Sequence, residues 1–587
     1  MTKPTIQQRG RDRQGADTYA QLKRFALLAA VAVLSASLWW ALAQPAPAPL
    51  ASLFPGGAML YLEAKDANSL LRDWDSSTEK TSWLQSSNYG SFSRSHLFLR
   101  LADAQTEFAQ AAGVPTDYAL YNSVAGGNSA VAMYDIGKLE FLYITHLPSA
   151  RALNTALWKS RGNYQTRRAG GVDYYLKEDP ASHRTAAFAY TGDLLLLATR
   201  ADALAGSLEL IARVNRPSIA SEPWFQNTTQ AAAAGDRDLR LVYNMERLIQ
   251  THQFRSHWIQ NNTPSLREFV SGLADLERAR GEVRERRVLL RSNASADGSS
   301  FEPRAGQLLA LAPDDAGLYR LWSRPESSLA AHWIEEKIYS ATTAAAPKRD
   351  SAPGVTESSD AGSEADLEIR IDEAPLSDAR SAQAFETLRA RLNAVNLDAM
   401  LEVSSTVLQP DQVFVQPHAA LVLLSSSNWD ANQVRAALTS AANGLWTAAG
   451  LGAGWRAGAN GAQELDGLGI IILVVDGQRL IISDSADLVN SILARRNRPA
   501  AAGATYEASW HHARELPNFD RLMRLIDFPQ VRTADGADSA AADNAGVFYS
   551  QNIGSLGHVL GRVDSATITV HDLGALVREN VVYRLRP

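Results

Sequence analysis

Cysteine is absent from the chain of 587 residues. The protein therefore has no disulfide framework, no thiolate zinc site, no catalytic cysteine and no lipid-modified N-terminal cysteine. An excess of basic residues is also missing, because 57 Lys and Arg stand against 63 Asp and Glu and give a formal net charge of -6. This balance provides no overall attraction to nucleic acid, and we expect no nucleic-acid partner.

Long uncharged hydrophobic runs are absent with one exception, residues 25–43, which read FALLAAVAVLSASLWWALA. A helix of that length spans about 28 Å, close to the hydrocarbon core of a bilayer at about 30 Å. The preceding tail, residues 1–24, has a net charge of +4. The positive-inside rule then predicts a single membrane crossing, with residues 1–24 in the cytoplasm and the rest exported.

The exported part begins with an uncharged Pro/Ala linker, residues 44–50. We interpret residues 25–43 as an uncleaved transmembrane signal anchor, because both the charged tail and the apolar run are long for a cleaved signal peptide. The alternative is cleavage after Ala43, since Ala41-Leu42-Ala43 has the form of a signal-peptidase site.

Sequence blocks in the exported part recur in order, which predicts an internal duplication. Residues 211–217 (IARVNRP) resemble residues 493–499 (LARRNRP), and residues 187–199 resemble residues 471–483. A strand, a glycine turn and a second strand are predicted in both residues 187–199 and residues 471–483, and each hairpin is followed by a helix with an apolar stripe. The two repeated regions begin with residues 54–61 and 312–319, which share the pattern Pro-x-x-Ala-x-Leu-Tyr.

These patterns predict an α+β fold: an N-terminal transmembrane helix followed by two tandem, duplicated modules with largely antiparallel sheets. The first module covers residues 51–300 and the second residues 308–587. Residues 341–366 are rich in Ala, Ser, Pro and acidic residues, and we expect them to form a disordered insertion in the second module. The sequence also predicts a helix over residues 264–280 and strands over residues 282–291 and 580–586.

Several motifs suggest chemistry but lack the partners that the chemistry needs. Ser77-Thr78-Glu79-Lys80 has the S-x-x-K form, without the further elements of penicillin-recognising enzymes. The glycines of residues 450–458 have the wrong spacing for a dinucleotide loop. His511, His512 and Glu515 provide at most two ligands on one helical face, fewer than a zinc site requires. We therefore predict no catalytic, cofactor-binding or metal-binding residues and no cofactor.

Two further charged segments have structural interpretations. Residues 278–291 contain six arginines and could contact lipid headgroups or an anionic polymer, but interspersed glutamates favour a solvated strand. Asp535, Asp538 and Asp543 lack the spacing of a calcium loop.

The repeated Pro-x-x-Ala-x-Leu-Tyr starts and the strand–turn–strand–helix blocks resemble the bacterial envelope proteins grouped as domain of unknown function 3352. The resemblance covers most of residues 50–587, although residues 341–366 and 367–415 depart from it. It implies a bacterial inner-membrane protein with its bulk in the periplasm, and it brings no catalytic residues.

We expect a non-enzymatic envelope scaffold that binds a protein partner and contacts the inner membrane through one helix. One alternative is a carrier of a lipid, peptide or small molecule in a cleft between the modules. The other is a periplasmic enzyme with an unrecognised site. An apolar cavity of a few hundred Å³ favours the carrier, convergent ionisable residues favour the enzyme, and a flat exposed apolar patch favours the scaffold.

Overall fold

The computed structural model describes residues 49–232, 235–251, 266–339, 379–408, 415–443, 454–466, 470–527 and 560–586. The predicted tail, the predicted membrane segment, most of the linker and the predicted insertion at residues 341–366 lie outside these ranges. Among the helices of the described ranges, none is both long enough and apolar enough to cross a membrane.

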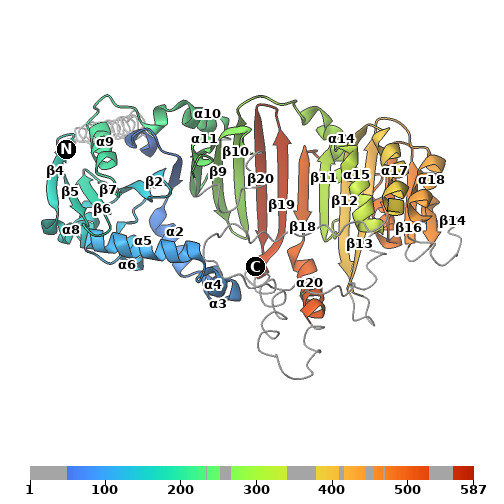
Figure 1. Cartoon of the computed structure of the whole chain (residues 1–587), viewed down its shortest axis with the longest axis horizontal. Helices are drawn as coiled ribbons and strands as arrows, with labels where there is room; N and C mark the ends of the chain where they lie inside the picture. The colour runs from blue at the N-terminus through green and yellow to red at the C-terminus, as the bar shows by residue number, and fades with distance from the viewer. Residues whose placement is uncertain are drawn as a thin grey trace, which may run out of the picture.

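The described chain has an α+β fold built on one large antiparallel sheet of 20 strands, which confirms the predicted class at this level (Figure 1). The strands of the first half are β1 (Leu60–Ala64), β2 (Ser129–Asp135), β3 (Glu140–His146), β4 (Gln165–Ala169), β5 (Val172–Glu178), β6 (Thr185–Thr191), β7 (Leu194–Ala198), β8 (Leu239–Asn244), β9 (Phe269–Ala279) and β10 (Glu282–Arg291). Those of the second half are β11 (Leu318–Ser323), β12 (Leu397–Val407), β13 (Gln416–Ser425), β14 (Trp455–Ala457), β15 (Gln463–Asp466), β16 (Ile470–Asp476), β17 (Arg479–Ser483), β18 (Tyr506–Trp510), β19 (Val563–Asp572) and β20 (Leu576–Leu585).

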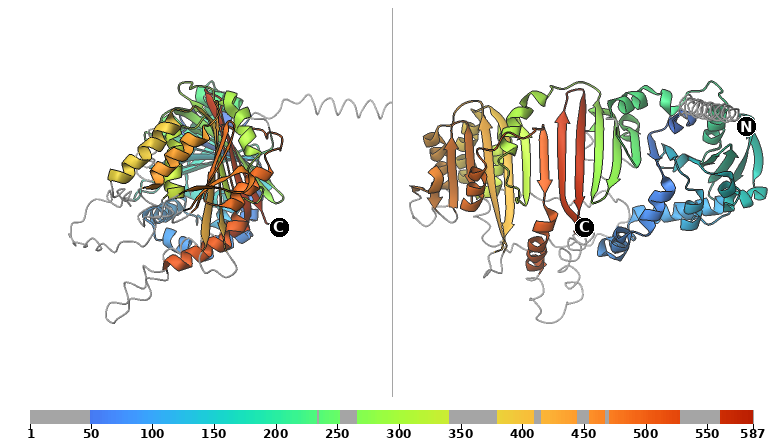
Figure 2. Two further views of the ribbon diagram at one scale, coloured as in Figure 1. Left: turned by 90° about the vertical axis from the view of Figure 1, so that its right-hand side faces the viewer. Right: turned by 180° about the vertical axis from the view of Figure 1, so that it is seen from behind.

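Helices cover parts of both faces of this sheet (Figure 2). The first half contains η1 (Leu50–Leu53), α2 (Ala67–Asp75), α3 (Thr78–Gln85), α4 (Ser87–Phe92), α5 (His96–Ala112), α6 (Tyr118–Val124), α7 (Ser149–Ala152), α8 (Ala156–Lys159), α9 (Ala201–Ile211), α10 (Pro223–Ala231) and α11 (Met245–Leu248). The second half contains α14 (Glu302–Leu309), α15 (Ser327–Trp333), a π-helix η5 (Ile334–Tyr339), α17 (Ala379–Asn393), α18 (Ala431–Asn443), α19 (Ala486–Ala494) and α20 (His512–Asp527).

The strand pairings of the first half recur in the second half in the same order. The first half runs β4-β5-β6-β7-β3-β2-β1-β8-β9-β10 across the sheet. The second half runs β14-β15-β16-β17-β13-β12-β11-β18-β19-β20. Adding ten to each strand number of the first order therefore gives the second.

The two halves meet edge to edge at one antiparallel strand pair, β10 with β20 (Figure 1). The register runs from Glu282 opposite Arg584 to Leu290 opposite Leu576. Because β10 also pairs with β9 and β20 with β19, the hydrogen bonding is continuous from one half into the other. The outer edges of the whole sheet are β4 and the three-residue β14.

Alternating residues of the strands build two hydrophobic layers in each half, as expected for a sheet covered on both faces. In the first half, α9 and α10 cover one face through Leu204, Leu208 and Phe225. The opposite face packs against residues of α5, α6 and α8, among them Ala112, Val124 and Leu157. In the second half, α14 and α19 cover one face and α15, α17 and α18 the other.

Both predicted hairpins are present, and their glycine turns explain them. Gly192 links β6 to β7 with a φ of 62°, and Gly477 links β16 to β17 with a φ of 58°. Residues with side chains rarely adopt this left-handed conformation, so glycine is favoured at both turns. The predicted helices after the hairpins are also confirmed, as α9 and α19.

The predicted helix over residues 264–280 is wrong, because most of it forms strand β9. The buried face of β9 includes Ser271 and Asp275, and this interrupts the apolar alternation that marks a strand. Both polar side chains have buried partners: Ser271 Oγ lies 2.6 Å from Thr228 Oγ1, and Asp275 binds Arg240. Tertiary pairing with β8 and β10 therefore overrides the helical spacing of the leucines.

Candidate functional site

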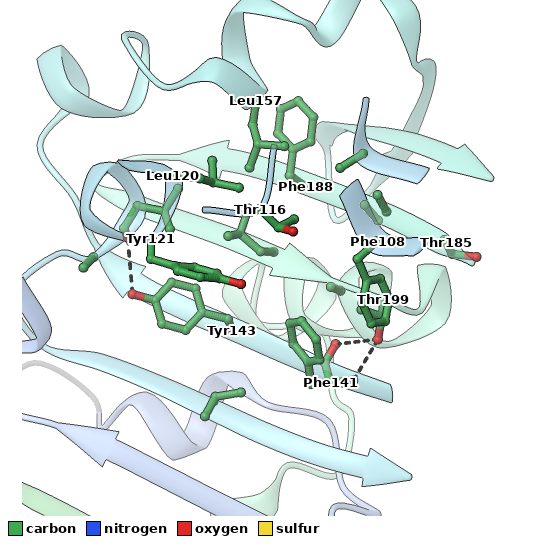
Figure 3. A pocket seen from close by; sticks show the side chains of 18 of the residues that line it. Phe108, Thr116, Leu120, Tyr121, Phe141, Tyr143, Leu157, Thr185, Phe188 and Thr199 are labelled. Carbon is green, nitrogen blue, oxygen red and sulfur yellow. Dashed lines mark hydrogen bonds between the residues drawn. The ribbon is translucent and has the colours of Figure 1, made fainter. Parts of the chain in front are cut away.

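An apolar cavity of about 530 Å³ lies inside the first half, between the sheet and helices α2, α5, α6 and α8 (Figure 3). Its wall is almost entirely hydrocarbon and aromatic. The larger side chains that line it are Leu71, Phe108, Leu120, Tyr121, Val124, Val131, Phe141, Tyr143, Leu157, Phe188 and Leu197. The volume falls within the range of about 300–1,000 Å³ that is typical of small-molecule sites.

Local sequence signals place the two helices that form most of the outer wall. Ser95 caps the start of α5 by accepting from the Phe98 N–H, and Gly113 ends α5 in the left-handed conformation. Asp117 then caps α6 by accepting from the Leu120 N–H at 2.9 Å. The short connection holds Phe108 of α5 and Tyr121 of α6 over the same stretch of sheet.

Hydrogen bonds to the protein engage several of the polar atoms near the cavity. The Tyr143 hydroxyl oxygen lies within hydrogen-bond distance, 3.2 Å, of both the Val124 carbonyl oxygen and Ser129 Oγ. Thr199 Oγ1 donates to the Leu139 carbonyl oxygen. It also accepts from the Phe141 N–H (Figure 3). Burial raises the pKa of Tyr164, behind the cavity, to about 12, so its hydroxyl stays protonated and donates to Ala112. The interior therefore offers mainly apolar contacts.

The equivalent face of the second half is filled by side chains. The strand register places Leu421, Ile482, Leu473 and Ile471 where the first half has Tyr143, Leu197, Phe188 and Ala186. These four residues are at most 1% exposed and pack in one cluster with Phe385 and Leu388 of α17 and Leu438 of α18. The corresponding face of the sheet therefore borders a cavity in the first half and packs into a closed hydrophobic core in the second half.

A second cleft, of about 600 Å³ and lined by charged side chains, adjoins the cavity and shares Phe108, Thr185 and Thr199 with it. Its carboxylates are held by arginines. Glu107 lies 2.8 Å from Arg184, and Glu140 lies 3.0 Å from Arg200. Asp202 also binds Arg200, whose hydrogen bond lowers the pKa of this carboxyl. With its pKa lowered in this way, Asp202 is a poor general acid at neutral pH.

The residues that the sequence singled out have structural contacts instead. Ser77 caps α3 by accepting from the Lys80 N–H, and the Lys80 ammonium binds Asp75. Of the glycines in residues 450–458, Gly454 and Gly458 are described, and a Cβ at Gly458 would contact the Glu464 side chain. Asp535, Asp538 and Asp543 lie outside the described residues.

Residues 511–515 join α20 to its neighbours rather than forming a metal site. His511 Nδ1 lies 2.5 Å from the Ala316 carbonyl oxygen, and His512 is buried with its ring 4.6 Å from that of Trp510. Glu515 accepts from the Thr406 backbone N–H and side chain on β12. Across the described ranges, no group of three or more His, Asp or Glu side chains is arranged to hold a metal ion.

The arginines of residues 278–291 are mostly paired with carboxylates. Arg284 contacts Glu282 at 2.6 Å, Arg286 contacts Glu277 at 3.1 Å, and Arg291 contacts Asp572 at 2.5 Å. Arg287 reaches across the joint to Glu579 at 3.2 Å. These pairs favour the interpretation of this segment as a structural, partly solvated strand.

One buried carboxyl in the second half has no cationic partner within ion-pair distance among the described residues. Glu507 of β18 accepts from the Tyr319 hydroxyl at 2.8 Å and from Thr569 at 3.5 Å, and burial raises its pKa. A raised pKa means that folding disfavours the charged form. At pH values below the ordinary pKa of glutamate, Glu507 therefore does not lower the free energy of unfolding. As the pH rises through the pKa of Glu507 in the folded protein, that free energy falls.

We expect Glu507→Gln to raise the melting temperature at about pH 8, where the carboxyl is ionised in the unfolded chain and folding opposes that charge, and to give a smaller gain at about pH 4. Thermal unfolding followed by circular dichroism at both pH values measures this difference. Glu178→Gln, at an exposed strand position, is the matched control and should change little at either pH. An equal effect of Glu507→Gln at both pH values would contradict the assignment.

Sequence reasoning missed the cavity, since its lining comes from many elements and no motif marks it. No family model matches the sequence, and no curated protein matches it. Among solved structures, the chain is similar to crystal form I of TP0453, with 13% identity and a TM-score of 0.23 over 43% of this chain and 82% of that chain. Crystal form III gives 14% identity and the same TM-score over 43% and 83%. At this TM-score we draw no conclusion about fold or function from the likeness.

Proposed function

We propose that this chain is a non-enzymatic binding protein of the bacterial envelope and that the cavity of its first half holds an apolar ligand. The observation that supports this proposal is the apolar cavity of about 530 Å³ beneath α5 and α6. Burial of hydrocarbon in such a space contributes roughly 25 cal/mol per Å² of apolar surface. The carrier interpretation is thereby favoured over the enzyme, with the ligand inside the first half and not between the halves.

The location and ancestry in this proposal come from the sequence. Residues 25–43 would anchor the chain in the inner membrane, with residues 44–587 in the periplasm. The recurrence of strand pairings supports a duplication of one α+β module. We further propose membership of the envelope proteins grouped as domain of unknown function 3352, on the repeated motifs at residues 54–61 and 312–319.

Partner binding, as a scaffold, is the second candidate, and exposed apolar side chains on helices α2 to α6 favour it. Trp74 is 52% exposed, Leu99 51% and Leu101 46%. Further large apolar side chains on these helices are also exposed, namely Leu84, Phe92, Tyr118 and Tyr121. Exposed apolar groups gathered on neighbouring helices are typical of interaction surfaces.

Filling the cavity tests the proposed function. We expect Ala186→Phe, on the cavity wall, to reduce binding of the neutral apolar dye N-phenylnaphthylamine at least about tenfold, the equivalent of about 1.4 kcal/mol. Because the new ring occupies existing space, the melting temperature should change little or rise. Dye fluorescence with the full-length protein, held in an amphipathic polymer, measures the binding.

Ala508→Phe on β18 is the matched control, since it makes the same substitution at a half-buried strand position outside the cavity. It should retain dye binding. Equal dye fluorescence from wild type, Ala186→Phe and Ala508→Phe would mean that the cavity is not the binding site and would overturn the proposal.

A further inference from the structure

The charged cleft meets the apolar cavity at Phe108, Thr185 and Thr199, so one ligand could occupy both spaces. The guanidinium of Arg184 lies over the Phe108 ring, 5.0 Å from its centre. Figure 3 shows Phe108, Phe141 and Thr199 grouped at one end of the cavity, with Leu120, Leu157 and Phe188 away from them. One end of the cavity thus adjoins the charged cleft near Arg184, and the other end is apolar.

The charges of the cleft are unevenly distributed. At one side, Arg200 pairs with both Glu140 and Asp202, which leaves a local excess of negative charge. At the other side, Arg184 pairs with Glu107 alone, and its Nη1 donates to the Lys138 carbonyl oxygen. Among the described residues, no carboxylate lies within ion-pair distance of the exposed Lys138 ammonium, and none accepts a hydrogen bond from Arg184 Nη2. The Arg184 side therefore has an unpaired positive charge and unused donors next to the cavity.

We propose that the ligand is a single-chain amphiphile with an anionic head, with its chain in the cavity and its head beside Arg184 and Lys138. This inference rests on the proposed function and adds the chemical class of the ligand. An anionic head cannot enter the apolar interior without a large desolvation cost, so we expect it to stay in the charged cleft beside Arg184 and Lys138. Guanidinium and ammonium groups are the usual partners of carboxylates and phosphates.

Competition against N-phenylnaphthylamine on the full-length protein tests the head group. Laurate, lauryl alcohol and a lauroyl lysophosphatidylglycerol compete separately, because they share a chain and differ in the head. We expect both anions to displace the dye at lower concentration than the alcohol. The better of the two anions identifies the source of the ligand as a free fatty acid or a lysophospholipid.

Two variants locate the head. Lys138→Glu should lower the preference for laurate over the alcohol about threefold to tenfold, because it replaces an exposed attraction with a repulsion. Arg184→Gln should lower it by about tenfold or more, because charge-assisted hydrogen bonds are lost. Lys159→Glu on α8 makes the same charge reversal outside the cleft and should keep the wild-type preference. Melting temperatures confirm that each variant is folded.

The possible failures are distinguishable. If the dye binds in the cavity but laurate and lauryl alcohol compete equally, the anionic head is wrong while the proposed function stands. The same conclusion follows if Lys138→Glu and Lys159→Glu lower the preference alike. If the dye binds no better to wild type than to Ala186→Phe, the proposed function fails, and this inference fails with it.

Discussion

Replacing Asp275 with alanine is expected to lower the free energy of unfolding by about 3–5 kcal/mol. Asp275 is 3% exposed on β9, and both of its oxygens accept from Arg240, at 2.7 and 2.6 Å. The Arg240 side chain is itself only 12% exposed. The substitution would leave this guanidinium buried without its carboxylate, and that desolvated charge is the main cost. Urea denaturation followed by circular dichroism measures the change.

An exposed ion pair in the same half provides the control. Arg168 and Asp173 lie 3.7 Å apart, with side chains 72% and 60% exposed. Asp173→Ala should cost about 1 kcal/mol or less, because water screens the pair. Similar losses from Asp275→Ala and Asp173→Ala would show that burial does not determine the contribution of the Asp275–Arg240 pair.

Replacing Val288 with proline is expected to be the second large change, because Val288 lies on the strand that joins the two halves. Val288 is buried in β10 between Leu273 of β9 and Arg578 of β20. Proline lacks the N–H, and each buried backbone group left unsatisfied costs about 1–3 kcal/mol. Loss of the valine packing adds to this cost. We expect a lower urea midpoint and, if the joint opens before the rest, two transitions in place of one.

Gln165→Pro is the control for this substitution. Gln165 is the exposed first residue of the outer strand β4, a position where proline is tolerated. Its unfolding midpoint should stay close to that of the wild type. A Val288→Pro protein as stable as the Gln165→Pro protein would show that continuity through β10 contributes little to stability.

The parts of the fold that sequence could predict are those set by local conformational preference. Gly192 and Gly477 marked two hairpins because a glycine turn between apolar strands has few alternatives. Strand β9 was missed, because Ser271 and Asp275 face the core and are satisfied only by Thr228 and Arg240 from other elements. A polar residue on a buried face looks solvent-exposed in sequence until its partner is known.

The candidate site could not be predicted from sequence for a related reason. Phe108, Tyr143 and Leu197 are ordinary apolar residues on three elements, and the cavity arises from the space that α5 and α6 leave over the sheet. In the second half, the register positions of Tyr143 and Leu197 hold Leu421 and Ile482, which belong to a closed core. Residue type alone does not separate these two outcomes, because packing depends on the helices above.

The joint between the halves uses one edge strand from each half. β10 and β20 occupy corresponding places in their halves and pair antiparallel, so each half offers the same edge to the other. Such an isologous contact consumes both of these edges at once. The outer strands of the described sheet are shorter and more polar, since β4 has five residues that include Arg167 and Arg168, and β14 has three residues. The two outer edges of the described sheet therefore disfavour pairing with a strand of another chain.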